Sequence, residues 1–244
     1  MDDETQPAMG VAHCSGRQHG LADGRFLGAR RRALAVSIVL AFAWPFAQAQ
    51  SAAAAASGDA LVLIVGDSLS AEYGLERGRG WVALLEARIA QNKVRARVVN
   101  ASISGDTTSG GRSRLPALLA QHKPGVVVIE LGGNDALRGL PMSSTKDNLA
   151  AMTRAAKAAG AQVVLLGMQV PPNYGRSYGE EFVKAFADVA EREKAELVPF
   201  FLRGVADVPQ AESLFQNDRI HPTEAAQPTM LDNVWPALSK LLKR

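Results

Sequence analysis

The alternation of short, continuously apolar runs with longer helical segments is the feature that most constrains how this 244-residue chain can fold. Residues 61–65 and 125–129 are almost entirely apolar and β-branched, the pattern of strands that are buried on both faces. Further strands are predicted at residues 97–99, 162–166 and 197–199. Strands that alternate with helices in this way predict a three-layer α/β domain with a five-stranded parallel sheet.

Apolar residues at helical spacing predict the helices between these strands. They are expected at residues 81–90, 147–159, 180–194 and 234–242, and residues 116–122 form the end of another helix. Parallel sheets of this kind carry their functional groups at the carboxyl ends of the strands. Glycine-containing and polar breaks follow the predicted strands, so we expect the functional site at that edge of the sheet.

A secretory signal peptide is predicted near the N-terminus. Three arginines at residues 30–32 precede an apolar run over residues 33–43, and residues 47–49 (Ala-Gln-Ala) supply the small-x-small pattern of a signal-peptidase site. The apolar run is too short to span a bilayer as a helix, and a membrane anchor or a buried helix is the alternative interpretation. Because the arginine run lacks the rest of a twin-arginine signal, we expect Sec-dependent export.

Cleavage after Ala49 divides the chain into three parts: residues 1–49, an N-terminal extension with the signal peptide; residues 50–59, a flexible tether; and residues 60–244, one folded domain. The only cysteine, Cys14, lies in the part that is removed, so the mature chain has no disulfide and depends on a packed core. We expect the protein in the periplasm, with secretion as the alternative.

Composition argues against several classes of protein. The formal net charge is +3, and the lysines and arginines are scattered among acidic residues rather than gathered into a stripe that would bind nucleic acid. His122 and His221 are the only histidines left after processing, which gives almost no support to a metal site. We expect a monomer that uses no cofactor and no metal, binds no nucleic acid and does not insert stably into a membrane.

Ser68 is the candidate nucleophile. It directly follows the first predicted strand at the turn into a helix, where its hydroxyl is exposed and a helix N-terminus favours negative charge. Position alone does not decide its role, because a serine after a strand is commonly a helix N-cap.

Asp218 and His221 are the candidate partners of Ser68. Their Asp-x-x-His spacing lets the carboxylate accept a hydrogen bond from one imidazole nitrogen and leaves the other nitrogen free as a base. His122, by contrast, lies at the end of a predicted helix before Lys123, a common place for a cationic side chain, and is interpreted as structural.

Two further residues are candidates for an oxyanion hole, the set of donors that acyl transfer needs around the developing alkoxide. Gly105 lies in a loop after the second strand, where a backbone N–H can approach a ligand closely. Asn134 follows two glycines at the end of the third strand and offers a side-chain amide. Taken singly, each is more often a turn residue.

These motifs together resemble the ordered blocks of the SGNH (GDSL) hydrolase family. The blocks are residues 66–70 (Gly-Asp-Ser-Leu-Ser), 100–107 around Gly105, 132–135 (Gly-Gly-Asn-Asp) and 218–222 (Asp-Arg-Ile-His-Pro). The bacterial thioesterase/arylesterase/lysophospholipase branch is the most similar. The resemblance implies a flavodoxin-like sheet and a Ser68–His221–Asp218 triad. It also implies an oxyanion hole formed by the Ser68 N–H, the Gly105 N–H and the Asn134 amide.

The resulting hypothesis is a serine esterase that hydrolyses carboxylic esters and thioesters through an acyl-enzyme. Lysophospholipids are a further candidate substrate. The alternatives are a carbohydrate O-deacetylase of the same fold and a catalytically inactive, lipid-binding relative. An α/β-hydrolase would need a Gly-x-Ser-x-Gly elbow at the nucleophile, and the turn after the first strand, Gly66-x-Ser68-x-Ser70, only approaches that pattern. The phosphate-binding loops of nucleotide-binding domains do not follow the first strand either.

The expected partners are small acyl esters or thioesters, and two residues are candidates for binding them. Leu69 follows the nucleophile, and Tyr174 lies in residues 170–181, which are expected to form a mobile connection that lines the acyl groove. One departure from the family pattern is Glu72, which stands where relatives of this branch usually carry glycine.

Overall fold

The computed structural model describes residues 59–243. The predicted signal peptide and all but the last residue of the predicted tether lie outside the described residues. Among the helices in the described range, none is long and apolar enough to cross a bilayer.

A five-stranded parallel sheet forms the centre of the domain, in the order β2-β1-β3-β4-β5. The strands are β1 (Ala60–Gly66), β2 (Ala96–Asn100), β3 (Val126–Glu130), β4 (Gln162–Leu166) and β5 (Glu196–Val198). The three inner strands are almost completely buried, whereas the edge strand β2 is half-buried. The fold class expected from the sequence is therefore confirmed, including the number and direction of the strands.

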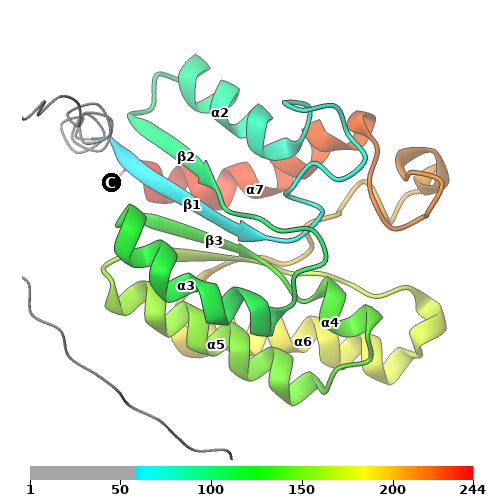
Figure 1. The fold of residues 1–244 in the computed structure, drawn as a ribbon. Helices are drawn as coiled ribbons and strands as arrows, with labels where there is room; N and C mark the ends of the chain where they lie inside the picture. Colours follow the sequence, from blue (N-terminus) through cyan, green and yellow to red (C-terminus); the bar gives the residue numbers. More distant parts are fainter. Residues whose placement is uncertain (1–58, 244) are drawn as a thin grey trace, which may run out of the picture. The chain divides into compact units, whose positions relative to one another are not determined.

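Helices cover both faces of the sheet (Figure 1). One face carries α2 (Trp81–Gln91) and α7 (Gln227–Leu242), and the other carries α3 (Thr108–His122), α5 (Met142–Ala158) and α6 (Arg176–Glu193). The short helix α4 (Gly133–Leu137) follows β3. Three 3₁₀ helices complete the fold: η1 (Pro172–Tyr174), η2 (Ala211–Leu214) and η3 (Glu224–Ala226).

Several helices begin a turn or more before the position that apolar spacing predicts. Helix α5 begins at Met142 instead of residue 147, and α6 begins at Arg176 instead of residue 180. Their first turns are mostly polar, so they lack the apolar pattern that marks a buried helix face. Consequently the expected mobile connection over residues 170–181 is instead largely η1 and the first turns of α6.

The register of the two central strands sets up the functional edge of the sheet. Gly66, at the end of β1, pairs with Glu130, at the end of β3. The segments that follow these strands, residues 67–80 and 131–141, therefore leave the sheet side by side. The segment after β2 joins them, because the Ile103 N–H donates a hydrogen bond of 3.0 Å to the Gly66 carbonyl.

Candidate active site

Ser68, His221 and Asp218 meet at the carboxyl edge of the sheet. The Nε2 atom of His221 lies 2.9 Å from Ser68 Oγ, and its Nδ1 atom lies 2.7 Å from Asp218 Oδ2. Ser68 lies two residues after the end of β1, whereas the other two residues lie on the loop between η2 and η3, about 150 residues further along the chain. The structure thus brings together the three residues that the sequence proposed.

The loop that carries Asp218 and His221 is held by its own backbone. Phe215 and Pro222 form an antiparallel bridge, and the Gln216 N–H donates to the His221 carbonyl at 2.7 Å. Asp218 Oδ1 accepts hydrogen bonds from the backbone N–H groups of Ile220 and His221, at 2.9 and 3.0 Å. The hydrogen bonds from the His221 N–H and ring, followed by that from Ile220, lower the pKa of Asp218 to about 2. Asp218 is therefore a carboxylate throughout the neutral range.

Tyr73 is a neighbour of the site that the sequence analysis missed. Its ring centroid lies 4.3 Å from that of the His221 imidazole, at an interplanar angle of 38°. Tyr73 follows Glu72, whose φ of 59° lies in the left-handed region that favours glycine. The Glu72 carboxylate accepts hydrogen bonds from the N–H groups of Gly78 and Gly80, at 3.0 and 2.9 Å, and so holds the loop that presents Tyr73. A single tyrosine carries no pattern that would have revealed this contact.

The three proposed oxyanion donors differ in how they are held. Among the described residues, neither the Ser68 N–H nor the Gly105 N–H has a hydrogen-bond acceptor, so both are free for a ligand. Asn134, in α4, donates one amide hydrogen to Asp67 Oδ2 at 2.9 Å, which leaves the second hydrogen available. Gly132 precedes this helix with a φ of 123°, a backbone conformation that requires glycine.

The loop after β2 fixes the peptide of Gly105. Gly105 has a φ of 78°, and its carbonyl accepts a hydrogen bond of 2.8 Å from Arg138 Nη2. Arg114 of α3 anchors the same loop, since its Nε donates to Asp106 Oδ2 at 2.8 Å and its Nη2 to the Gly66 carbonyl at 3.3 Å. The loop is tied to the end of β1, although Gly105 itself is not part of the cleft wall described next.

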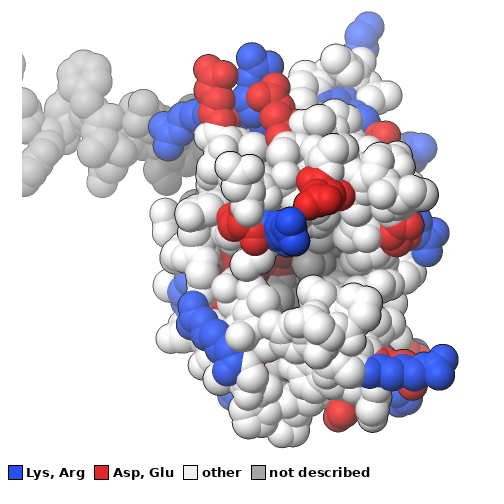
Figure 2. Space-filling model, turned by 90° about the vertical axis from the view of Figure 1, so that its right-hand side faces the viewer, with Lys and Arg blue, Asp and Glu red and all other residues white. Residues whose placement is uncertain are grey.

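An apolar cleft of about 610 Å³ opens beside Ser68 and His221. Leu69 lines it, as the sequence predicted, and most of its remaining wall is apolar: Ala136, Leu137, Met168, Val170, Pro171 and Phe200. Figure 2 shows this edge of the molecule, with a hollow near its centre that has charged residues along its upper rim and uncharged residues below it. The cleft has the size and polarity that an acyl chain needs.

Tyr174 does not line this cleft, contrary to expectation. Its ring stacks on Tyr178 with the centroids 6.1 Å apart, and Tyr178 in turn stacks on Phe182 at 6.4 Å. The reason is that α6 begins earlier than predicted, so Tyr174 joins a row of aromatic side chains that runs along this helix. The apolar wall at this point comes from Val170 and Pro171 instead.

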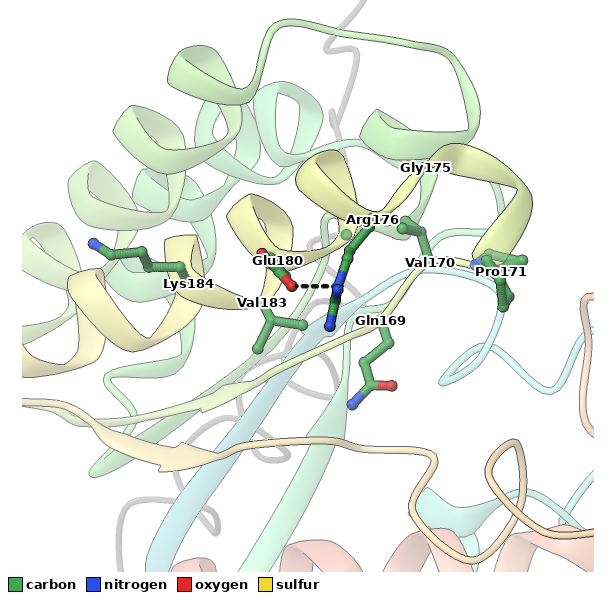
Figure 3. Close-up of a pocket in the computed structure, with 10 residues that line it drawn as sticks. Gln169, Val170, Pro171, Gly175, Arg176, Glu180, Val183 and Lys184 are labelled. Atoms are coloured by element: carbon green, nitrogen blue, oxygen red, sulfur yellow. Dashed lines mark hydrogen bonds and ion pairs between the residues drawn. The ribbon is translucent and has the colours of Figure 1, made fainter.

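A second hollow of about 560 Å³ adjoins the cleft and shares residues 169–172 with it (Figure 3). Its other side is the first half of α6, where Arg176 Nε donates to Glu180 Oε1 at 3.0 Å. Lys184, further along, pairs with Asp188 at 2.9 Å. Each of the three charged side chains that line this hollow, Arg176, Glu180 and Lys184, therefore has an ion-pair partner.

In the described range, no group of three or more His, Cys, Asp or Glu side chains is placed so that it could hold a metal ion. His122, interpreted as structural from the sequence, is the last residue of α3 and lies next to the C-cap residue Lys123. The Ser–His–Asp arrangement at the carboxyl edge of a parallel sheet defines a serine hydrolase, built here on a three-layer fold.

Comparisons with known proteins narrow this class. The model of the GDSL-like Lipase/Acylhydrolase family matches residues 64–227. Esterase TesA of Pseudomonas aeruginosa is 56% identical over 181 residues, which are 74% of this chain and 89% of that protein. Thioesterase 1/protease 1/lysophospholipase L1 of Escherichia coli K12 is 45% identical over 171 residues, 70% of this chain and 79% of that protein. The chain belongs to the GDSL-like lipase/acylhydrolase family, known also as SGNH hydrolases, and is an ester hydrolase.

Solved structures agree with this assignment. The crystal structure of TesA matches with a TM-score of 0.72 and 56% identity, over 74% of this chain and 99% of that one. A psychrotrophic esterase EstA from Pseudoalteromonas sp., in a structure inhibited by monoethylphosphonate, matches with a TM-score of 0.71 and 40% identity. That match covers 76% of this chain and all of the other.

Proposed function

We propose that the chain hydrolyses carboxylic esters and acyl thioesters through an acyl-enzyme, with Ser68 as nucleophile, His221 as general base and Asp218 as its orienting partner. The observation that carries this proposal is the chain of two hydrogen bonds from Ser68 Oγ through the imidazole to the Asp218 carboxylate, at 2.9 and 2.7 Å, beside an apolar cleft.

The proposed reaction has two steps. Ser68 Oγ attacks the ester carbonyl carbon while His221 Nε2 takes the hydroxyl proton, and the ionised Asp218 stabilises the imidazolium that results. The imidazolium then protonates the leaving alcohol or thiol, and the acyl group stays on Ser68. In the second step His221 deprotonates a water molecule, which attacks the acyl-enzyme and releases the carboxylic acid and the free serine.

The oxyanion of each tetrahedral intermediate is proposed to lie among the N–H groups of Ser68 and Gly105 and the second amide hydrogen of Asn134. The free state of the two backbone donors and the fixed amide of Asn134 support this assignment. Donors that are held in place before the reaction stabilise the developing charge without reorganisation.

The substrate class follows from the cleft and the relatives. The apolar wall supports an acyl chain rather than a sugar ring, so the carbohydrate O-deacetylase alternative is disfavoured. Relatives named esterase, arylesterase and thioesterase/lysophospholipase support aryl and alkyl esters, acyl-CoA-type thioesters and lysophospholipids as substrates. A panel of p-nitrophenyl esters, acyl-CoAs, lysophospholipids and acetylated sugars tests this class, and activity confined to the sugars would refute it.

Labelling with a fluorophosphonate tests the nucleophile. Such a reagent should modify Ser68 once per chain, with loss of activity in proportion, and Ser68→Ala should be neither labelled nor active. Mass spectrometry of the labelled peptide identifies the serine. A label on any other serine contradicts the assignment, and an active but unlabelled Ser68→Ala would favour another mechanism.

Leu69 is proposed to contact the acyl chain. Leu69→Ala should lower kcat/KM for a dodecanoyl ester about tenfold more than for an acetyl ester, because a long chain loses apolar contact and a short one does not. Tyr174→Ala is the matched control, since its ring stacks on Tyr178 outside the cleft. Equal chain-length effects of the two substitutions would speak against this role of Leu69.

Export to the periplasm is proposed on the arginine cluster, the apolar run and the Ala-Gln-Ala pattern of residues 30–49, with secretion as the alternative. The exported protein should begin at Gln50 or a close neighbour. N-terminal sequencing of the periplasmic and culture fractions decides between the two locations, and a retained arginine cluster contradicts cleavage.

We infer that the enzyme acts as a monomer that binds no nucleic acid. All three members of the proposed triad come from one chain, so no second copy is needed to complete it. Light scattering should give the mass of a single chain, and a stable dimer at working concentration would contradict the inference.

A further inference from the structure

A buried polar network lies beneath the Ser68 turn and takes no direct part in the chemistry proposed above. Glu130, the last residue of β3, is 1% exposed. Its Oε2 atom accepts hydrogen bonds from the Asp67 N–H at 3.2 Å and from the Ser70 hydroxyl at 2.8 Å. A carboxyl group in such surroundings is unfavourable unless its hydrogen bonds compensate the loss of water, so its presence calls for a specific role.

Asp67 connects this network to the proposed oxyanion hole. Its side chain is 3% exposed, and its two oxygens accept from different partners. Oδ1 accepts the Leu69 N–H at 3.1 Å, and Oδ2 accepts the Asn134 amide at 2.9 Å. The residues on both sides of Ser68 are therefore held by carboxyl groups, and so is the amide of Asn134.

The packing around Glu130 leaves its carboxyl group little freedom. A Cβ atom on Gly66 would lie 2.8 Å from Glu130 Oε2 and 2.8 Å from Ser70 Oγ, so only glycine fits above the carboxyl group. Trp81, which is completely buried, donates its indole N–H to Ser70 Oγ at 3.1 Å. The first glycine of the Gly-Asp-Ser block is thus required by the network below it.

The charges around the pair favour a single proton on Glu130. Burial raises the pKa of Glu130 well above its usual range, and the charge of Asp67 raises it further. Burial also raises the pKa of Asp67, to about 6, although the hydrogen bonds from Leu69 and Asn134 act to lower it. Two other charged groups face the pair: Arg114 of α3, which donates to the Gly66 carbonyl, and His221, whose positive form interacts with Asp67. At neutral pH this leaves Glu130 as the acid and Asp67 as the carboxylate.

We propose that Glu130 is a positioning residue that works as a neutral acid: it holds the turn around Ser68 and, through Asp67, directs the amide of Asn134 into the oxyanion hole. The inference rests on the proposed role of Asn134. Glu130 itself contacts Asp67 and Ser70, not the reacting atoms. Its effect should therefore be on kcat and not on substrate binding.

Two substitutions of Glu130 separate positioning from bulk. Leucine leaves the Asp67 N–H and the Ser70 hydroxyl without an acceptor, whereas glutamine keeps an acceptor oxygen and, like the neutral acid, carries no charge. We expect Glu130→Leu to lower kcat at least tenfold with KM within twofold. Glu130→Gln should keep kcat within threefold of wild type, with an unchanged pH profile between pH 6 and 9. Equal losses in the two variants would overturn the neutral-acid role.

Thr153→Val is the matched control for the loss of a buried hydrogen bond. Thr153 is completely buried in α5, where its hydroxyl donates to the Leu149 carbonyl at 2.8 Å, away from the site. This variant should lower the melting temperature and leave kcat unchanged. If it lowers kcat as much as Glu130→Leu does, the effect at Glu130 is one of stability alone, and the inference is wrong.

A double-mutant cycle keeps the test decisive even if Glu130→Leu fails to fold. Asp67→Asn should lower kcat about tenfold in the wild-type background and less than twofold in Asn134→Ala, because the amide that Asp67 directs is then absent. Equal losses in both backgrounds would overturn this inference and leave the proposed function standing. An unchanged kcat in Asn134→Ala alone would instead refute the oxyanion role, and this inference with it.

Discussion

Two carboxylate systems lie beside Ser68, and they differ in burial and in the direction of their pKa shifts. The outer system is Asp218 with its partner His221, and the lower system is the buried pair of Asp67 and Glu130. Asp218 lies on an outer loop with 36% of its side chain exposed, whereas Asp67 and Glu130 are 3% and 1% exposed below the nucleophile turn. Hydrogen bonds from His221 and Ile220 lower the pKa of Asp218 to about 2, while burial raises that of Asp67 to about 6. The sign of each pKa shift depends on which effect dominates: N–H donors lower the pKa of a carboxyl group, and the loss of water raises it.

This difference suits different tasks. A carboxylate that must stabilise an imidazolium needs to stay charged, and the loop of Asp218 provides N–H groups for that purpose. The proposed role of the lower pair is geometric, so one of its two groups can remain neutral.

Disrupting the outer system should give the largest effect. His221→Ala should lower kcat by about 10⁴-fold or more, because Ser68 then lacks a base, while the free energy of unfolding changes by less than about 1 kcal/mol. Steady-state kinetics and thermal melts measure the two quantities. His122→Ala, at the end of α3, is the matched control and should keep full turnover. Comparable losses in both variants would remove His221 from the proposed triad.

Removing the amide that joins the lower system to the reaction should have the next largest effect. Asn134→Ala should lower kcat by about 10²–10³, the usual loss for one oxyanion donor, with little change in KM. The kinetics of a short-chain p-nitrophenyl ester provide the measurement. A raised KM with unchanged kcat would mean that Asn134 binds the substrate instead of the oxyanion.

The two systems should respond oppositely to acid. The pKa of Asp67 is raised, so from pH 6 to 4 the folded state takes up a proton before the unfolded state does. Wild type should therefore gain stability relative to Asp67→Asn over that range, by at most about 1.4 kcal/mol per pH unit. For Asp218 the pKa is lowered, so the advantage of wild type over Asp218→Asn should be lost as the pH falls from about 4 to 2.

Urea unfolding of wild type, Asp67→Asn and Asp218→Asn at several pH values measures these differences. The sign of each trend is what matters for the comparison. Parallel curves for wild type and Asp67→Asn between pH 4 and 6 would show that the lower pair does not retain an extra proton.

The smallest effect is expected at Glu72, which holds the loop that presents Tyr73 to His221. Glu72→Gln should lower kcat/KM about two- to fivefold, because a neutral side chain holds the N–H groups of Gly78 and Gly80 less firmly and loosens the contact of Tyr73 with His221. Glu76→Gln is the matched control, since Glu76 is exposed and pairs only with Arg79 at 3.7 Å. Equal effects at both positions would separate this loop from catalysis.

The sequence predicted the sheet well, because strands buried on both faces need continuous β-branched runs such as those of β1 and β3. It did not predict α4, whose five residues are too few to show helical spacing and which depends on the unusual backbone of Gly132. The first turns of α5 and α6 were missed for a different reason: they are mostly polar and lack the apolar spacing of a buried helix face.

The proposed site likewise contains residues that the sequence predicts and residues that it does not. Ser68, Asp218 and His221 lie in short motifs whose spacing has a chemical meaning, so the sequence alone predicts them. Glu130 was not found, because a glutamate at the end of a strand resembles an ordinary surface residue until its burial is known. Tyr73 was missed because its contact with His221 depends on the conformation of its loop, which no sequence pattern reveals.

The close approach of Glu130 and Ser70 to Gly66 also restricts how this chain can evolve. A methyl group on Gly66 collides with both side chains, so Gly66→Ala alone should be harmful. A replacement at Glu130 alone or at Ser70 alone would leave the other of the two collisions in place. A larger residue at Gly66 must therefore wait for changes at both Glu130 and Ser70, which makes the order of substitutions as important as their identity.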